Sequence, residues 1–296
     1  MDKIAFIFSG QGDQYPGMGK ELYDNFAAAK EVYDLCESLR PGTLAQCFYG
    51  TGEELKETKN TQPCLFVMEL AAASVLLSKG ITPQAAAGFS LGEVAAAAMS
   101  GVLDKETGFA LVIKRGELMQ REAEKFDTAM ASVVKLSAPK VQEICDRYEK
   151  VYPVNFNCPG QIAVSGLATQ MAKVFVDVRA AGGRAIPLKV RGAFHSPFMT
   201  EAAKAFGEEL NKAALHKPDI TLYSDMTAEP YGEDAGKLLS GQICHPVQWE
   251  KLIRNMIADG INTFIEIGPG QTLTNMMKRI DCGVKAMTVN DCLGKV

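Results

Sequence analysis

The pentapeptide Gly-Phe-Ser-Leu-Gly at positions 88–92 constrains the fold of this chain more than any other stretch. It follows an apolar run at 85–87 and precedes an alanine-rich run at 93–98, so it joins a predicted strand to a predicted helix. Gly-x-Ser-x-Gly in that setting is typical of a nucleophile elbow, a turn so tight that only glycine fits two residues either side of the serine. The helix N-terminus behind the serine favours developing negative charge. Ser90 is therefore the candidate nucleophile, and a purely structural glycine turn is the alternative.

Composition limits the classes of function. The 296 residues are 47% hydrophobic and 22% charged, which is typical of a globular protein with one large domain or a main domain with a small insertion. A net charge of −4 argues against nucleic-acid binding, which needs a basic surface. We expect no membrane span, because the most apolar run, at 65–68, is followed by Glu69, and the apolar run at 4–8 is a first strand rather than a signal peptide.

Cysteine and histidine usage points to a cytoplasmic protein without a metal. The eight cysteines form no Cys-x-x-Cys pair, so we expect them to be reduced and mostly buried. None of the three histidines (His195, His216 and His245) lies four residues from another, so no metal site is expected.

Short strand-like runs alternate with longer helical ones, which predicts an α/β fold with a mainly parallel sheet. The predicted strands of the main domain are 4–8, 85–89, 220–223, 263–267 and 286–289; the predicted helices are 18–39, 63–79, 91–100, 104–125, 197–214, 247–259 and 271–280.

The pattern changes between 127 and 191. Strand 129–134, helix 139–148, strands 154–157 and 162–165, helix 168–181 and strand 184–190 follow one another. This β-α-β-β-α-β order is that of a ferredoxin-like unit. We therefore predict a subdomain at 127–191 inserted into a large α/β domain formed by 1–126 and 192–296, with a cleft between the two that suits a ligand site.

A serine nucleophile needs a base, and His195 is the best candidate. It lies on a loop where the chain leaves the predicted insertion, with Gly192 before it and Pro197 after it. A structural histidine is the alternative reading. His245, before Pro246, is the competing base, although its place ahead of a helix also suits capping or packing, which we favour.

Oxyanion stabilisation requires N–H donors aimed at one point. The elbow supplies the N–H of Leu91, and the turn after the first strand, at Gln11, can supply a second because parallel strands end at one edge of the sheet. For Gln11 a plain tight turn is an equal alternative. The turn is no dinucleotide or phosphate loop, since Tyr15 replaces the third glycine and Met18 the lysine.

Two charged residues lie near these elements. Arg115 has Leu111, Leu118 and Met119 at helical spacing, so it is predicted to face inward, where a guanidinium needs an anionic partner: an acid from another element or a substrate carboxylate. Glu93 follows the elbow, and we expect it to compensate the helix dipole rather than to face the nucleophile.

Taken together, these pieces resemble the malonyl-CoA:acyl-carrier-protein transacylases, the acyltransferase family of fatty-acid and polyketide synthesis. The match runs nearly end to end. It includes Phe-Ser-Gly-Gln-Gly at 8–12, Gly-Phe-Ser-Leu-Gly-Glu at 88–93, Arg-Gly at 115–116, Asn-Phe-Asn at 155–157, Gly-Ala-Phe-His-Ser at 192–196, Gln242, Pro-Val at 246–247 and Gly-Pro-Gly at 268–270.

The resemblance implies a hydrolase-like α/β domain with a ferredoxin-like insertion, and a malonyl transfer from CoA to the phosphopantetheine thiol of an acyl carrier protein, with no cofactor. It implies these roles: Ser90 as nucleophile, His195 as base, the N–H groups of Gln11 and Leu91 as oxyanion hole, Arg115 as ligand of the malonyl carboxylate, the Gln242 carbonyl as the group that orients the imidazole, and Asn157 near the site. Family members usually act as monomers.

Two positions depart from the family pattern. Phe89 stands where the elbow usually has histidine, and His245 stands where asparagine is common before the proline. We expect changed packing or pH response with retained chemistry. The Gly-Ala-Phe-His-Ser form is associated with malonyl selectivity.

Two other function classes compete. A serine esterase or thioesterase shares the elbow, but its histidine usually comes late in the chain, and His195 does not. A non-catalytic module that docks a carrier protein is the second, and intact Ser90, His195 and Arg115 argue against it. An acidic carrier would favour basic residues near the cleft, for which Lys114, Lys189 and Arg191 are candidates.

Overall fold

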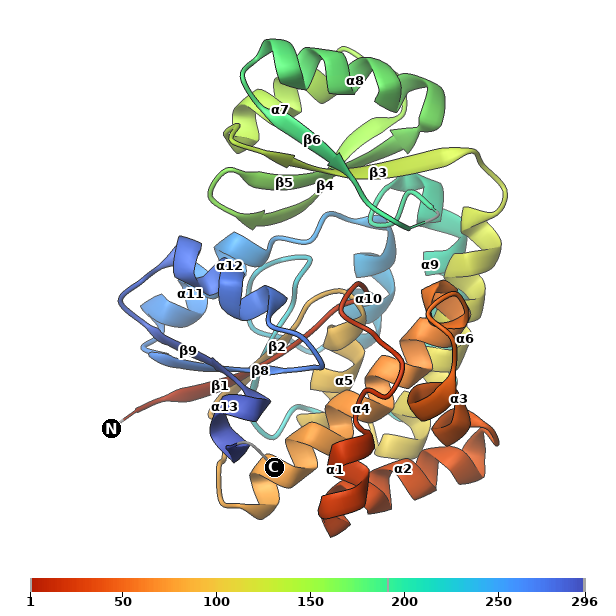
Figure 1. Cartoon of the computed structure of the whole chain (residues 1–296), viewed down its shortest axis with the longest axis vertical. Coiled ribbons are helices and arrows are strands. Elements are labelled where there is room, and N and C mark those ends of the chain that lie inside the picture. The colour runs from red at the N-terminus through yellow and green to blue at the C-terminus, as the bar shows by residue number, and fades with distance from the viewer. Residues whose placement is uncertain (1, 191, 295–296) are drawn as a thin grey trace.

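The computed structural model describes residues 2–190 and 192–294 and contains two sheets (Figure 1). The larger sheet consists of β1 (Ile4–Phe8), β2 (Ala85–Gly88), β7 (Thr221–Tyr223), β8 (Thr263–Ile267) and β9 (Lys285–Thr288). Its order is β7-β2-β1-β8-β9, and every pairing is parallel. All five strands were expected near these positions, and the predicted α/β class is confirmed.

The two faces of this sheet are covered by different helices, because side chains alternate along a strand. The helices of this domain are α1 (Lys20–Asn25), α2 (Ala27–Leu39), α3 (Thr43–Tyr49), α4 (Thr58–Ser78), α5 (Leu91–Met99), α6 (Lys105–Ala123), α9 (Thr200–Leu210), α10 (Ala235–Gly241), α11 (Trp249–Ala258), α12 (Thr272–Ile280) and α13 (Val289–Leu293). Phe6 and Phe8 of β1 lie in a core with α2, α4, α5 and α6, whereas Ala5 and Ile7 lie in a second core with α11 and α12.

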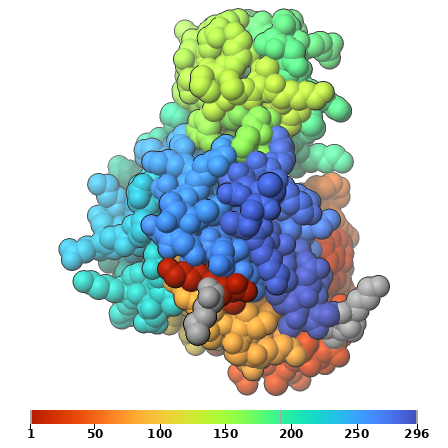
Figure 2. All heavy atoms as spheres, turned by 90° about the vertical axis from the view of Figure 1, so that its left-hand side faces the viewer, coloured from red at the N-terminus to blue at the C-terminus, as the bar shows by residue number. Residues whose placement is uncertain are grey.

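The smaller sheet belongs to a subdomain that projects from the main body as a separate lobe (Figures 1 and 2). Its elements follow the predicted β-α-β-β-α-β order: β3 (Thr128–Val134), α7 (Ala138–Cys145), β4 (Val151–Cys158), β5 (Gln161–Leu167), α8 (Ala168–Ala180) and β6 (Arg184–Pro187). The strands pair antiparallel in the order β4-β5-β3-β6. Residue 191, the predicted end of this subdomain, lies outside the described residues.

Helix α4 runs on through Glu69, which was expected to end the apolar run at 65–68. By length and composition it could cross a membrane, with a mean hydropathy of 1.4, although 83% of that apolar window is buried inside the structure. Glu69 does not interrupt the helix, because its side chain is fully buried and accepts a hydrogen bond from the Ser9 hydroxyl at 2.7 Å. It is the one such helix among the described residues, and its burial is that of a core helix.

Other differences concern helix ends. The helix expected at 18–39 is divided into α1 and α2, because Phe26 is extended, with φ −131°. The helix expected at 197–214 begins with a 3₁₀ turn at Pro197–Met199 and ends at Leu210. Helices α3, α10 and α13 were not expected, because they are at most seven residues long and too short for a clear hydrophobic period.

Candidate active site

Ser90 occupies the turn between β2 and α5, as predicted, with backbone angles φ 55° and ψ −106°. Such a conformation is costly for a residue with a side chain and persists only where the surroundings hold it. The Ser90 N–H donates to Asp225 Oδ2 at 2.6 Å. The strained turn lifts the hydroxyl toward the groups that surround it.

Glycine is required beside the serine because the chain packs closely there. A Cβ atom on Gly92 would lie 2.4 Å from the carbonyl oxygens of Phe8 and Ser9, and one on Gly88 would lie 2.0 Å from the Glu93 nitrogen. The spacing of the pentapeptide thus records the approach of α5 to the end of β1.

We expect Gly92→Ala to lower the free energy of unfolding by ~1–3 kcal/mol or more, because the added methyl overpacks against backbone that cannot move aside. Gly52→Ala is the matched control, since a Cβ at Gly52 meets nothing within 4 Å. Urea denaturation of both variants measures the difference. Equal stability of the two would contradict the packing argument.

His195 lies against Ser90. Its Nε2 is 2.8 Å from Ser90 Oγ, and its Nδ1 is 2.8 Å from the Gln242 carbonyl oxygen. A carbonyl only accepts, so Nδ1–H donates to it and Nε2 is left to accept the Ser90 proton. Burial, reinforced by the nearby Arg115 cation, lowers the pKa of His195 to about 4. The imidazole is therefore neutral, as a base must be.

Arg115 of α6 is 1% exposed, and its side chain lies beside the same serine. Nη1 donates to Gln62 Oε1 at 2.8 Å, and Nη2 donates to Gln242 Oε1 at 2.7 Å and to Ser90 Oγ at 3.3 Å. Nε is buried without a partner among the described residues. Among the described residues, no carboxylate forms an ion pair with the Arg115 guanidinium.

Two partners were expected for Arg115: an acid from another element or a substrate carboxylate. Within the described residues, no acid lies within ion-pair distance of it. Burial lowers the pKa of Arg115 to about 10, so the guanidinium stays charged at neutral pH. A buried cation whose hydrogen-bond partners are all neutral is a site for an anion.

Two backbone N–H groups at the cavity are available to donate hydrogen bonds. Those of Gln11 and Leu91 form no hydrogen bond with another described residue. Their turns meet at the carboxyl ends of neighbouring parallel strands, where the Phe89 N–H donates to the Phe8 carbonyl at 2.9 Å. Gly10 allows this approach, since a Cβ there would lie 2.8 Å from the Phe89 oxygen.

A cavity of about 60 Å³ connects these groups. A water-sized group needs ~10–15 Å³ by this measure, so the space suits a short acyl group rather than a long chain. Its walls bring together five predicted site residues (Gln11, Ser90, Leu91, Arg115 and His195) with the unforeseen Gln62 and Asn155.

Asn157 is not part of the cavity wall; Asn155 is. The two belong to β4, where the pairing with β5 shifts between Pro153 and Asn155 and again between Phe156 and Cys158. In a regular strand, residues 155 and 157 would face the same side. The irregular pairing breaks this alternation, so Asn157 does not line the cavity beside Asn155. Asn157 is buried, and its Oδ1 has no partner among the described residues.

Comparison with known proteins agrees with this geometry. The acyl transferase domain family matches residues 5–295. A malonyl CoA-acyl carrier protein transacylase of Bacillus subtilis is 38% identical, covering 98% of this chain and 94% of its own length. The chain belongs to this transacylase family.

Solved structures of transacylases superpose closely. That of malonyl CoA-acyl carrier protein transacylase from Clostridium perfringens is 34% identical with a TM-score of 0.95, covering 99% of this chain and 96% of its own. A malonyl-transacylase in complex with its type II PKS acyl-carrier protein is 30% identical with a TM-score of 0.94, and the match covers 98% of this chain and 96% of its own.

The two departures from the transacylase pattern have different surroundings. The rings of Phe89 and Trp249 pack edge to face, with centroids 5.4 Å apart, and Phe89 contributes to the cavity wall. His245 is exposed, and its Nδ1 donates to the Gly241 carbonyl at 2.7 Å. His245 thus closes a turn, which agrees with the capping or packing role we favoured for it.

Besides Asn155, three residues around the transacylase site were not predicted to belong to it. Gln62 is in α4, and Asp225 follows β7; the rule that parallel strands end at one edge is the one signal that could have indicated Asp225. Glu93 was expected to compensate the dipole of its helix. It does lie in the first turn of α5, but it is also fully buried, because the segment containing Asp225 and Tyr231 folds over it.

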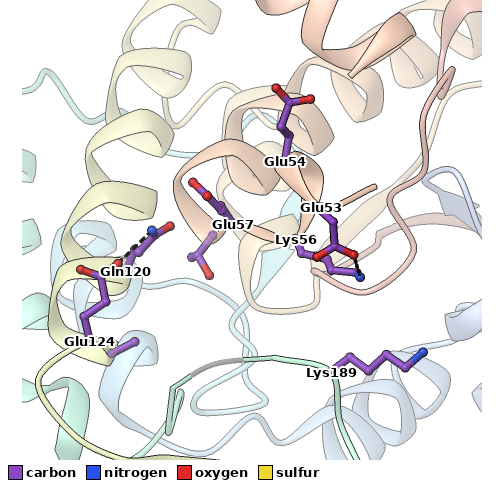
Figure 3. Close-up of a pocket in the computed structure, with 9 residues that line it drawn as sticks. Glu53, Glu54, Lys56, Glu57, Gln120, Glu124 and Lys189 are labelled. Carbon is purple, nitrogen blue, oxygen red and sulfur yellow. Dashed lines mark hydrogen bonds and ion pairs between the residues drawn. The ribbon is translucent and has the colours of Figure 1, made fainter. Parts of the chain in front are cut away.

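A groove of about 470 Å³ lies between the start of α4, the end of α6 and the chain after β6 (Figure 3). Lys189, one of the candidate docking cations, lines it, together with several glutamates. Lys114, another candidate, pairs with Glu117 at 3.1 Å. Arg191, the third candidate, lies outside the described residues.

We expect the acid limb of Ser90 acylation to fall below pH 6.5, the ordinary pKa of histidine. Because His195 has a lowered pKa, it stays neutral as the pH falls through 6.5 toward about 4. Over that interval the unfolded chain binds the proton that the folded chain refuses, so stability falls as the pH falls. Rates of acylation from pH 4 to 8, with unfolding curves, measure both; an acid limb at or above 6.5 would contradict the expectation.

Proposed function

We propose that this chain transfers a malonyl group from malonyl-CoA to the phosphopantetheine thiol of an acyl carrier protein. The observation that carries the proposal is the contact of Ser90 Oγ with His195 Nε2 at 2.8 Å and with Arg115 Nη2 at 3.3 Å. A nucleophile, a neutral base and an anion-binding cation thus share one small cavity. The names of the relatives support the same donor and acceptor.

The geometry permits a two-step exchange. His195 Nε2 accepts the Ser90 proton as Oγ attacks the thioester carbonyl, and the N–H groups of Gln11 and Leu91 stabilise the oxyanion. The C–S bond breaks, the CoA thiolate takes the proton from His195, and a malonyl ester remains on Ser90. The carrier thiol then attacks this ester, and the same proton path runs in reverse.

Arg115 fixes the free carboxylate of the malonyl group. It is the described cation nearest to Ser90 Oγ, so an acyl group with a terminal carboxylate is held in one pose while its thioester carbon faces Oγ. Both acyl carriers are thiols, so the overall exchange is nearly balanced energetically. The enzyme's task is then to admit a thiol and exclude water.

We further propose that the protein acts as a cytoplasmic monomer without a metal or organic cofactor, and without nucleic-acid or membrane partners. The acidic net charge supports the absence of nucleic acid. Within the described residues, no group of three or more His, Cys, Asp or Glu side chains is placed to hold a metal ion. Gel filtration and activity in the presence of a chelator test these points.

Intact-mass analysis tests the function directly. The protein is mixed separately with malonyl-CoA, acetyl-CoA and methylmalonyl-CoA, and then with holo acyl carrier protein. We expect a stable malonyl adduct on Ser90 that disappears as the carrier gains the same mass. Release of free malonate faster than transfer would favour an esterase or thioesterase, and no adduct at all would favour a non-catalytic docking module.

A further inference from the structure

Two buried acids beside the nucleophile have no part in the exchange described above. Glu93 of α5 and Asp225 of the segment after β7 are both fully buried. Asp225 Oδ2 accepts the Ser90 N–H at 2.6 Å. Glu93 Oε2 accepts the Asp225 N–H at 3.2 Å and the Gln242 side-chain N–H at 3.3 Å, and Glu93 Oε1 accepts the Tyr231 hydroxyl.

The two carboxyl groups need a proton between them. They are close neighbours, since Glu93 Oε2 accepts from the backbone N–H of Asp225 at 3.2 Å, and among the described residues neither forms an ion pair with a lysine, arginine or histidine within 4 Å. Asp225 Oδ1 is buried without a donor among the described residues. Two ionised carboxylates cannot remain side by side without water. A proton on Glu93 would give the pair a donor, which two ionised carboxylates lack.

The surrounding charges favour a state in which the carboxyl groups of Glu93 and Asp225 together bind one proton. Burial raises the pKa of Glu93 well above its ordinary value and that of Asp225 to about 6, while the Arg115 cation opposes the rise at Asp225. Besides Arg115, the Tyr231 hydroxyl faces Glu93. At neutral pH the pair then carries one negative charge, which offsets part of the buried charge of Arg115.

We propose that Glu93 and Asp225 share a single proton and act as positioning residues for Ser90 and Gln242. Gln242 connects the site: its carbonyl accepts from His195, its Oε1 accepts from Arg115, and its Nε2 donates to the Ser90 carbonyl at 2.8 Å and to Glu93. Asp225 holds the other side of Ser90. The pair thereby fixes the strained serine from its N–H and, through Gln242, from its carbonyl.

Kinetics of alanine and amide variants test the positioning role, which rests on the proposed function. We expect Asp225→Ala to slow Ser90 acylation by malonyl-CoA about 10- to 100-fold, with KM changed less than about 3-fold, because one hydrogen bond to a buried group is lost. Asp225→Asn and Glu93→Gln should acylate Ser90 at close to the wild-type rate, since in each variant an amide N–H replaces the shared proton. Glu266→Gln, a similar change of a buried glutamate that caps α12, is the control.

Infrared difference spectroscopy tests the shared proton without any activity. Wild type should show a protonated-carboxyl band at neutral pH that is lost in Glu93→Gln, since Asp225 alone ionises, and that is shifted in Asp225→Asn, since Glu93 stays buried but loses its charged hydrogen-bond acceptor. Glu69, a second buried acid with a raised pKa, supplies a band that stays in both variants.

The outcomes separate the two claims. A band that is unchanged in both amide variants overturns the shared proton, and full acylation rates in Asp225→Ala and Glu93→Ala overturn the positioning role. If wild type itself gains no malonyl adduct, the proposed function fails, while the infrared result still decides the state of the pair. Should an alanine variant fail to fold, the amide variants and the spectra retain the test.

Discussion

Replacement of Ser90 by alanine should abolish the malonyl adduct and lower the transfer rate by about 10⁴-fold or more, because the acyl group loses the oxygen placed to receive it. Ser90 Oγ is the atom that the neutral imidazole of His195 reaches at 2.8 Å and that Arg115 approaches at 3.3 Å. The residual rate would come from binding both thioester and thiol near the oxyanion donors.

Intact mass and carrier malonylation measure the Ser90→Ala variant. Folding should be retained, since alanine preserves the backbone, and the Asp225 contact uses the backbone N–H rather than the hydroxyl. Ser78→Ala, at an exposed serine whose hydroxyl bonds within α4, is the control and should transfer at the wild-type rate. Malonyl transfer by Ser90→Ala at more than about 1% of wild type would reject the acyl-enzyme.

Sequence reasoning predicted best those site residues whose immediate neighbours in the chain carry a pattern. The glycines around Ser90 are required by contacts of 2.0–2.4 Å that any Cβ would make, so their spacing alone indicated the turn. Arg115 was predicted to face inward from its helical neighbours, and it is 1% exposed. His195 was recognised from its place on a loop at the predicted domain junction, and its φ of 60° shows how tightly that loop turns.

What sequence reasoning missed depends on contacts between distant segments. Asp225 lies 135 positions from Ser90, and no local pattern relates the two. Glu93 was expected to compensate a helix dipole, because nothing in its own helix shows that another segment covers it. The place of Asn155 rather than Asn157 in the cavity depends on irregular strand pairing, which breaks the period of two that a sequence pattern reveals.

Arg115→Ala should lower kcat/KM for malonyl-CoA by about 100-fold while that for acetyl-CoA changes little, because only the malonyl group offers a carboxylate to the guanidinium. Acetyl-CoA lacks that carboxylate, so it loses no charge-assisted hydrogen bond when the cation is removed. The ratio of the two values is the measurement, since it is independent of the fraction of enzyme that is folded.

That independence matters because Arg115 also organises the site. Its Nη1 and Nη2 satisfy the side-chain oxygens of Gln62 and Gln242, so alanine leaves both unpaired and lowers stability as well as affinity. Arg115→Lys keeps the charge but not the fork of donors, and we expect an intermediate selectivity from it. If both variants kept the wild-type ratio, the guanidinium would serve only to support Gln62 and Gln242, and malonyl selectivity would have to arise from the shape of the cavity.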